Sequence, residues 1–424
     1  MTDLSRLTAV QALTGLRRGD FTALDLTRAC LGRIAERDGA IRAWLCLNPQ
    51  AEAQAAAIRN DDPRPLAGLP VGIKDVFDTA EMPTTYNSPL FDGHRPARDA
   101  AAVALLRAAG AIVIGKTDTT EFAAAGRNAA TGNPIDPAHT PGGSSAGSAA
   151  AVADFHVPLT LSTQTGGSTI RPASYCGVTA MKPSFGLIST EGMKRYAPSF
   201  DTVGFHARSV ADLALVAEVF DLPTARETSS IRLGLCRTPF ADRLSAPMIA
   251  LLDATAHRHD IVPVDLLPAF GEIDDLHRAI MFAEGAAAFL PLARTDASGL
   301  HADFYARIGS RTSATMREAF VARDRLARLA TELEDLMRYA GIDALITPAA
   351  PGTAPLGRAP GDPIFNALWT ALQMPCIALP AGHHDGLPIG LQLVGPRASD
   401  GLLLHIAAQI APTFASKETL LVTV

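Results

Sequence analysis

Residues 140–186 read TPGGSSAGSAAAVADFHVPLTLSTQTGGSTIRPASYCGVTAMKPSFG, and they hold the two features that decide the fold and the chemistry of this chain. In the first, Gly142 and Gly143 precede Ser144 and lead into a run of small residues, which lets a helix approach another backbone closely. In the second, a predicted strand at 157–162 ends in a second glycine-rich turn and a serine. The stretch therefore predicts a helix and a buried strand, each beside a serine at a glycine-rich turn.

The turn Gly166-Gly167-Ser168 has the composition of an anion-binding nest. Glycines allow successive backbone N–H groups to point at one place, where they can stabilise the oxyanion of a tetrahedral intermediate. Such a turn is also compatible with a flexible loop or a phosphate cradle. The phosphate interpretation is weaker, because the chain has neither GxxxxGK[ST] nor a GxGxxG after a strand. Ser168 is thus a candidate nucleophile.

A nucleophilic serine needs a base that takes its proton. Eleven histidines are scattered along the chain, but none lies in a diagnostic motif; His139 lies in a turn, and His383 with His384 precedes another turn. Lys74 is the better candidate, because it ends an apolar strand predicted at 69–74. A lysine acts as a base only if burial or its neighbours depress its pKa from about 10.4. The alternative is that Lys74 is an ordinary surface charge at the end of a strand.

Helices alternate with apolar strands along most of the chain, which predicts an α/β fold. We expect a single α/β/α sandwich domain, residues 1–424, with a mixed central β-sheet flanked by helices. Its expected parts are an N-terminal helical segment at 1–62 that packs on the core, a signature core at 63–221, a mostly helical pocket-wall region at 222–341, and the C-terminal part of the core at 342–424.

Local patterns give bounds for several elements. Thr22 is a candidate N-cap for a helix that runs to Ile34. Continuous apolar runs at 111–115 and 376–379 are typical of strands that are buried on both faces.

Composition narrows the class of protein. With 424 residues, 48% of them hydrophobic, the chain can bury a large core. Its net charge of −6 gives no basic field for nucleic acid or an anionic membrane. Its five cysteines form no CxxC pair, its N-terminus has no apolar signal sequence, and no apolar stretch approaches the roughly 20 residues that cross a bilayer. We therefore expect a cytoplasmic protein with no disulfide framework and no metal site.

The chain closely resembles the amidase signature family. Several motifs carry the resemblance and occur in the family's order, which makes it specific. They are GLPVGIKDVFDTAEMPTTYNS at 68–88, GGSSAGSAAAVA at 142–153, TQTGGSTIRPASYCGVTAMKPSFG at 163–186, DALITPAAPGTAP at 343–355 and NALWTALQMPCIALPAGHHDGLPIGLQLVGPR at 366–397. Most of the chain outside 222–341 is covered.

The resemblance implies a serine amidohydrolase with a Ser–cisSer–Lys triad that forms an acyl-enzyme. Ser168 would be the nucleophile, Ser144 the bridging serine and Lys74 the base. The peptide bond between Gly143 and Ser144 would be cis, and Ser145 would support the triad by hydrogen bonding. The chemistry would need no metal and no organic cofactor. The oxyanion hole would consist of the backbone amides of Thr165, Gly166, Gly167 and Ser168.

One departure from the common family pattern bears on the substrate. Arg171 follows the nucleophile by three positions, and Gln164 stands where an aspartate is common. That pattern resembles malonamidase, in which the matching arginine holds the free carboxylate of a half-amide and the threonine that matches Thr163 also lies at the site. A guanidinium fork suits a carboxylate well. The alternative is that Arg171 pairs with an internal carboxylate and only braces the loop.

Three functions stay open on sequence grounds. The first is an amidohydrolase that cleaves a small-molecule carboxamide, such as a carboxylate-bearing half-amide. The second is the A-type subunit of a glutamine-dependent amidotransferase, although this chain is short for one and carries TQTGGS rather than TDTGGS. The third is a catalytically silent binding subunit, against which the intact triad argues. We expect a small-molecule amide as partner, neither nucleic acid nor membrane, and leave a homodimer open.

Overall fold

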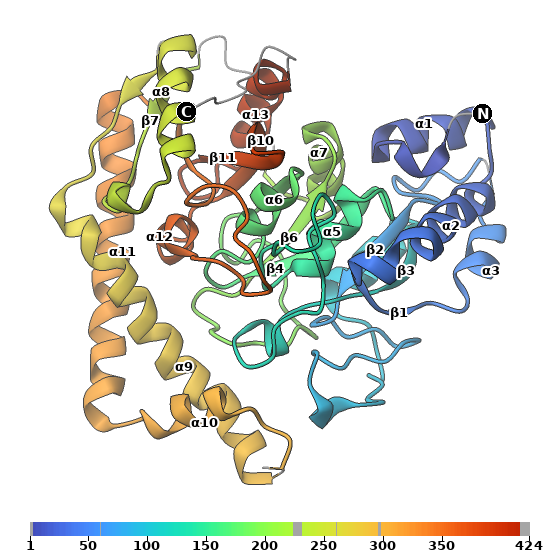
Figure 1. Cartoon of the computed structure of the whole chain (residues 1–424), viewed down its shortest axis with the longest axis horizontal. Coiled ribbons are helices and arrows are strands. Elements are labelled where there is room, and N and C mark those ends of the chain that lie inside the picture. Colours follow the sequence, from blue (N-terminus) through green and yellow to red (C-terminus); the bar gives the residue numbers. More distant parts are fainter. Residues whose placement is uncertain (1–2, 60, 224–230, 260, 296–297, 416–424) are drawn as a thin grey trace.

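A computed structural model gives the fold of the chain (Figure 1). The predicted outer boundaries at residues 1 and 424, and residues 224–230 of the predicted pocket-wall region, lie outside the described residues. The structure describes residues 3–59, 61–223, 231–259, 261–295 and 298–415.

Eleven strands of the described residues form one sheet at the centre of the molecule. In sheet order they are β1 (Trp44–Leu47), β3 (Ile112–Thr117), β2 (Pro70–Lys74), β4 (Leu159–Gln164), β6 (Thr202–Ala207), β5 (Thr179–Lys182), β10 (Cys376–His384), β11 (Leu387–Val394), β9 (Ala344–Pro348), β7 (Leu233–Leu235) and β8 (Val262–Pro263). Strand β2 runs parallel to both of its neighbours, whereas β4 pairs antiparallel with β6 and β10 with β11. The predicted mixed sheet is confirmed.

Helices cover the sheet on both faces. The helices of the described residues are α1 (Ala9–Arg18), α2 (Ala23–Ile41), α3 (Ala51–Ala56), α4 (Ala101–Ala108), α5 (Ala146–Ala153), α6 (Ile170–Cys176), α7 (Val210–Val219), α8 (Ala246–His259), α9 (Ile273–Thr295), α10 (Ala302–Gly309), α11 (Ser313–Ala340), α12 (Ile364–Ala371) and α13 (Asp400–Ala415). Helices pack on the strands in pairs, α5 with α6 and α7 with α13. Strands β2, β4 and β11 are buried along their whole length, so the predicted α/β/α arrangement is confirmed.

The small-residue run forms α5 and lets it approach a neighbouring backbone closely. A Cβ atom on Gly147 would collide with the carbonyl oxygen of Ala43 and the backbone nitrogen of Asp118. The Gly147 N–H donates instead to the Asp118 carbonyl at 3.0 Å. This contact fixes the start of α5, where Ser144 and Ser145 lie.

The second N-terminal helix begins where the sequence predicts. Thr22 caps α2 through reciprocal hydrogen bonds with Asp25, but the helix continues to Ile41 instead of ending at Ile34. The continuation is favoured because the residues after Ile34 include alanine, glutamate and arginine, which are strong helix formers.

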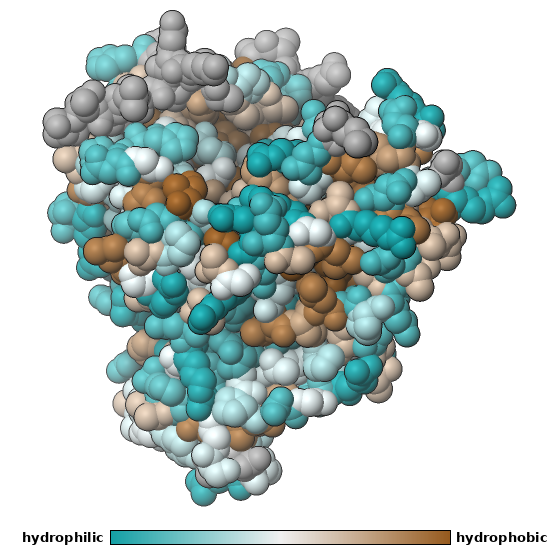
Figure 2. All heavy atoms as spheres, turned by 45° about the vertical axis from the view of Figure 1, so that its right-hand side comes forward, coloured by the Kyte–Doolittle hydropathy of each residue, from teal (hydrophilic) through white to brown (hydrophobic). Residues whose placement is uncertain are grey.

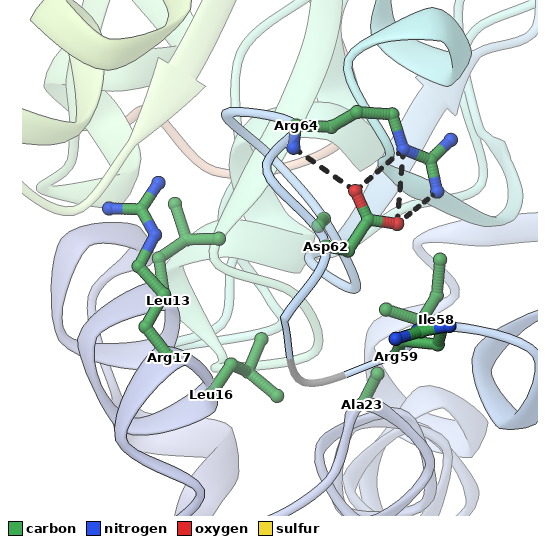
Figure 3. A pocket seen from close by; sticks show the side chains of 9 residues that line it. Leu13, Leu16, Arg17, Ala23, Ile58, Arg59, Asp62 and Arg64 are labelled. Atoms are coloured by element: carbon green, nitrogen blue, oxygen red, sulfur yellow. Dashed lines mark hydrogen bonds and ion pairs between the residues drawn. The ribbon is translucent and has the colours of Figure 1, made fainter.

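The chain that follows α3 folds back beside α1 and α2 (Figure 3). There the carboxylate of Asp62 accepts hydrogen bonds from the backbone N–H of Arg64 at 3.0 Å and from its Nε at 2.9 Å. The side chains around this ion pair enclose only about 10 Å³, roughly the room for one water. This crevice is therefore packing and not a ligand site.

The region at 222–341 contributes to the sheet as well as to the helical layer. Strand β7 pairs in parallel with β9, and β8 pairs with β7, so both extend the edge of the sheet. Sequence patterning did not predict them, because strands of two or three residues are too short to show a period. The long helices α9 and α11, with the short α10 between them in the chain, lie on the opposite side of the molecule from α1, α2 and α3 (Figure 1).

Hydrophilic and hydrophobic side chains are interspersed over the face shown in Figure 2. Its hydrophobic residues form separate patches and no continuous band. Within the described ranges, no helix has the length and the apolarity that crossing a membrane requires.

Parallel pairing brings the predicted base to the predicted catalytic loop. Ile73 of β2 lies opposite Leu161 of β4, so both strands end at the same edge of the sheet. Lys74 follows Ile73 directly, and Thr163 follows Leu161 by two residues. The carboxyl ends of parallel strands are where α/β proteins bind ligands, and this edge is therefore the place to look for a site.

Candidate active site

Lys74 is the centre of a cluster of hydroxyl groups. Its side chain is fully buried, and its Nζ lies within hydrogen-bond distance of three hydroxyls: Ser144 Oγ at 2.7 Å, Ser145 Oγ at 2.9 Å and Thr163 Oγ1 at 2.7 Å. Among the described residues no carboxylate lies within ion-pair distance of this nitrogen. The surface-charge alternative for Lys74 is thus wrong, and the amine lies buried in a neutral shell.

Burial lowers the pKa of Lys74 well below its ordinary value, while the charge of Asp201 raises it by less. The physical cause is desolvation, because the apolar interior disfavours the ammonium form and offers it no paired anion. A neutral lysine amine carries a lone pair that can accept a proton. The lowered pKa of Lys74 favours this neutral form, which is the form that a general base needs.

Two other buried lysines show why the hydroxyl shell matters. Lys116 pairs with Asp75 at 2.9 Å, and Lys182 donates to the backbone carbonyls of Pro183, at 3.0 Å, and Met374. Carboxylates and carbonyls only accept hydrogen bonds, so they stabilise a protonated lysine and cannot donate a proton to it. Hydroxyls both donate and accept. Lys116 also contacts one hydroxyl, that of Thr84 at 2.6 Å, but among the described residues Lys74 is the buried lysine whose side-chain partners are all hydroxyls.

The two serine-bearing turns lie side by side. The peptide bond between Gly143 and Ser144 is cis, as the family resemblance implied. The Ser145 N–H donates to the Ser168 carbonyl at 3.3 Å, and the Thr120 N–H donates to the Ser144 carbonyl at 3.3 Å. Backbone contacts therefore hold the start of α5 against the turn between β4 and α6.

Exposure increases along the predicted relay. Lys74 is 0% exposed, Ser144 3% and Ser168 8%. The predicted nucleophile is thus the outermost of the three, which is the order that a relay from a buried base to a substrate requires.

The turn that carries Ser168 has free N–H groups and occupied carbonyls. Among the residues that the structure describes, the backbone N–H groups of Gly166, Gly167 and Ser168 find no protein acceptor, whereas the carbonyls of Thr165, Gly166 and Gly167 each accept a hydrogen bond. A Cβ atom on Gly167 would lie 2.5 Å from Asn366 Oδ1, so only glycine fits there. Three unpaired donors on one turn are what the predicted nest requires, and their role as an oxyanion hole stays a prediction.

Arg171 is buried, 4% exposed, and points at the other serine turn. Its Nη2 donates to the Gly143 carbonyl at 2.6 Å, whereas Nε and Nη1 have no partner. Within the described residues it forms no ion pair, so the internal carboxylate of the bracing alternative is wrong; a backbone carbonyl takes that place. The predicted roles of Arg171 and Thr163 in substrate binding stay predictions.

Four further side chains surround the loop, and sequence reasoning missed all of them. Asp201 accepts from Thr165 Oγ1 at 2.6 Å, and the others, His277, Asn366 and Thr370, come from α9 and α12. Among these four, only His277 could have been found from the sequence pattern, because it lies between Ile273 and Ile280 on the buried face of its helix. A polar side chain on such a face must find a partner.

No group of three or more His, Cys, Asp or Glu side chains arranged to hold a metal ion lies among the described residues. The absence of a cofactor stays a prediction.

Known proteins are similar to this chain in sequence and in fold. The family model described as Amidase matches residues 25–404. The A-type subunit of glutamyl-tRNA(Gln) amidotransferase from Chloroflexus aggregans is 33% identical over 470 aligned positions, which cover 96% of each chain. Because this chain has 424 residues, that alignment opens gaps in it.

Two solved structures superpose closely. A structure described as an unexpected vestigial protein complex, which reveals the evolutionary origins of an s-triazine catabolic enzyme, has a TM-score of 0.87 and 28% identity over 96% of this chain and 98% of that one. Native peptide amidase from Stenotrophomonas maltophilia has a TM-score of 0.82 and 28% identity over 99% of both chains. These relatives do not support the narrower resemblance to malonamidase.

Proposed function

The chain belongs to the amidase family, and we propose from this premise that it cleaves a small carboxamide through an acyl-enzyme on Ser168. The observation that carries the proposal is the Lys74 amine, buried without a counter-ion and hydrogen-bonded to three hydroxyls. Ser168 is the proposed nucleophile, and Ser144 bridges it to the base.

In the proposed reaction, protons pass along the relay from Ser168 toward Lys74 and later back from the relay to the departing nitrogen. Neutral Lys74 takes the proton of the Ser144 hydroxyl while Ser144 Oγ takes that of Ser168, whose Oγ attacks the amide carbon. The carbonyl oxygen becomes an oxyanion against the free N–H groups of Gly166 and Gly167. The relay then protonates the departing nitrogen, the C–N bond breaks, and ammonia or an amine leaves. Water, activated by the same relay, hydrolyses the ester.

The test is a screen for released ammonia over half-amides, aryl amides, ureas, fatty amides and glutamine. We expect release from at least one class, together with a covalent acyl adduct on Ser168 in the intact mass after rapid quenching. A protein that releases ammonia from none of these classes, with no adduct, would count against a freestanding amidohydrolase.

Enzyme activity should rise with pH. Burial lowers the pKa of Lys74, so the amine becomes the neutral base at a pH well below the value of about 10.4 for a free lysine. The rate should be low where Lys74 is protonated and level off above the midpoint, which belongs to the coupled Lys–Ser–Ser unit. The measurement is kcat/KM between pH 5 and 10. A rate that falls as pH rises through this range would contradict a lysine base.

The substrate class that we propose is a half-amide whose free carboxylate binds Arg171. The guanidinium is buried and holds the Gly143 carbonyl with Nη2, and within the described residues its Nε and Nη1 have no partner. A carboxylate can accept a charge-assisted hydrogen bond from either of these donors. The charge of Arg171 would then be neutralised by the substrate itself.

Replacing Arg171 with methionine should selectively impair acidic substrates. Truncating a desolvated arginine–carboxylate contact costs on the order of 2–5 kcal/mol, which is roughly 30- to 5,000-fold in kcat/KM. The measurement compares short half-amides with matched neutral amides, in wild type and Arg171→Met. An equal loss on both classes would show that Arg171 only braces the Gly143 turn, and a thermal melt separates either result from unfolding.

A second candidate is an amidotransferase A-type subunit, and the sequence relatives favour it. The identity with the Chloroflexus aggregans protein extends over nearly the whole of both chains. Gln164 in place of aspartate and the gaps in the alignment favour the freestanding enzyme instead. Glutamine cleavage that appears only when amidotransferase partner subunits are added would establish the second candidate. A silent binding subunit would form no adduct with any of the amides.

A further inference from the structure

Two side chains from distant helices hold the loop of the proposed oxyanion hole. We infer that His277 of α9 and Thr370 of α12 are positioning residues, which aim the N–H groups of Gly166 and Gly167 at the reacting carbonyl. The inference rests on the proposed function, because it concerns the same loop. It identifies residues outside the triad on which the rate depends.

The argument starts from the geometry of the peptide unit. In a planar trans unit, the C=O of one residue and the N–H of the next point in opposite directions. A hydrogen bond to the Thr165 carbonyl therefore also sets the direction of the Gly166 N–H, and one to the Gly166 carbonyl sets that of Gly167. Two consecutive glycines give the backbone more freedom than any other pair. A glycine loop that must keep its N–H groups aimed thus needs anchors from outside.

His277 supplies the first anchor. Its Nε2 lies 2.8 Å from the Thr165 carbonyl oxygen, and since a carbonyl only accepts, this nitrogen carries the proton. The ring is 2% exposed and packs against Phe200 with centroids 4.5 Å apart and planes tilted by 35°, which restricts its orientation. The hydroxyl of Thr165 is held separately by Asp201 at 2.6 Å. Thr165 is therefore held through its side chain and its backbone.

Thr370 supplies the second anchor, and its contact with Gln164 determines in which direction its hydroxyl donates. Thr370 Oγ1 lies 2.7 Å from the Gly166 carbonyl and 3.0 Å from the Asn366 carbonyl one turn earlier. Gln164 Oε1 accepts from two backbone N–H groups at the start of α6, so its Nε2 must face Thr370 and donate to it at 3.0 Å. Because Thr370 accepts from Gln164, its single proton goes to a carbonyl, and Gly166 offers the shorter contact.

One of the two anchors, His277, lies in the 222–341 region, and the other, Thr370, lies beyond it. The loop between β4 and α6 is therefore held by residues that are 112 and 204 positions away in the chain. The rate should therefore depend on side chains that touch neither Ser168 nor the substrate.

The test measures how fast a fluorophosphonate probe labels the full-length protein. Ser168 Oγ forms a bond to phosphorus, fluoride leaves, the serine proton passes to the relay, and the P=O oxygen takes the place of the oxyanion. His277→Leu removes the donor, whereas His277→Gln keeps a side-chain N–H. Thr370→Val and Thr370→Ser form the equivalent pair. His206→Leu is the matched control, because His206 is also fully buried and contacts a backbone carbonyl, that of Thr169 at 2.9 Å, which sets the direction of the Ile170 N–H and not those of Gly166 and Gly167.

We expect His277→Leu and Thr370→Val to slow labelling by roughly 10- to 100-fold. The loss should be smaller than the 10²–10³-fold typical of deleting an oxyanion donor, because the N–H groups remain but are no longer aimed. The glutamine and serine variants should recover most of the rate. His206→Leu should stay within about threefold of wild type, although it removes a comparable hydrogen bond.

Labelling of both His277→Leu and Thr370→Val at the wild-type rate would overturn the inference. So would a loss in His206→Leu as large as theirs, or no recovery in the conservative variants, since either indicates general loosening of the fold. If His277→Leu does not fold, the comparison of Thr370→Val with Thr370→Ser tests the inference. Ser168→Ala tests the proposed function separately. A Ser168→Ala protein that is still labelled would overturn the proposed nucleophile and this inference with it.

Discussion

Ser168→Ala is expected to abolish amide cleavage and acyl-enzyme formation while leaving the fold intact. The hydroxyl that attacks the carbonyl is removed, and the hydroxyl of Thr165 at the start of the same turn is held by Asp201. The loss should be roughly 10⁴–10⁶-fold in kcat, the scale seen when a serine enzyme loses its nucleophile. The measurement is ammonia release on the best substrate of the screen, together with the intact mass of the quenched protein.

Ser148→Ala provides a matched control for this loss. Ser148 is a buried serine of α5 whose hydroxyl donates to the Leu161 carbonyl at 3.2 Å and contacts Thr117 Oγ1 at 2.7 Å, so its replacement removes two buried hydrogen bonds away from the proposed relay. It should melt at a lower temperature and keep most of its turnover. A Ser168→Ala protein that retained wild-type turnover, or a Ser148→Ala protein as inactive as it, would contradict the assignment.

Lys74→Met should lower kcat by roughly 10²–10⁴-fold, the usual contribution of general acid–base catalysis. Methionine fills a similar volume, but it cannot take a proton from Ser144. The variant should also lose the rise of activity with pH that the depressed pKa of Lys74 gives the wild type. The measurement is the pH profile of kcat/KM for both proteins.

Lys182→Met separates the base from buried lysines in general. Lys182 is likewise fully buried at the end of a strand, β5, but its Nζ donates to backbone carbonyls. We expect this control to lose stability, because it leaves carbonyls unpaired, and to keep the pH profile of the wild type. If both variants lose activity equally and both keep the profile, Lys74 is not the base.

Local sequence determined the elements that carry the site. The apolar run before Lys74 formed β2, the small-residue run formed α5, and Thr22 formed the cap of α2, because each depends on neighbours a few residues away. The motif order also placed Lys74, Ser144 and Ser168 in one family pattern.

Element ends and short strands were less accurate. Strand β10 continues from Cys376 to His384, whereas the apolar run predicted only its first half. Its second half is stabilised by pairing with β11, which local pattern does not reveal. Tertiary pairing also created β7 and β8, whose lengths are below any detectable period.

The sequence by itself thus determined the fold class and the residue types of the proposed relay, while the tertiary structure decided what each polar atom faces. The three hydroxyls on Lys74, the carbonyl partner of Arg171, the contact of His277 with Thr165 and that of Thr370 with Gly166 join residues 28 to 204 positions apart. A buried polar atom takes its pKa and its proton direction from these partners. Because pairing across the sheet and between helix layers selects them, no local pattern contains them.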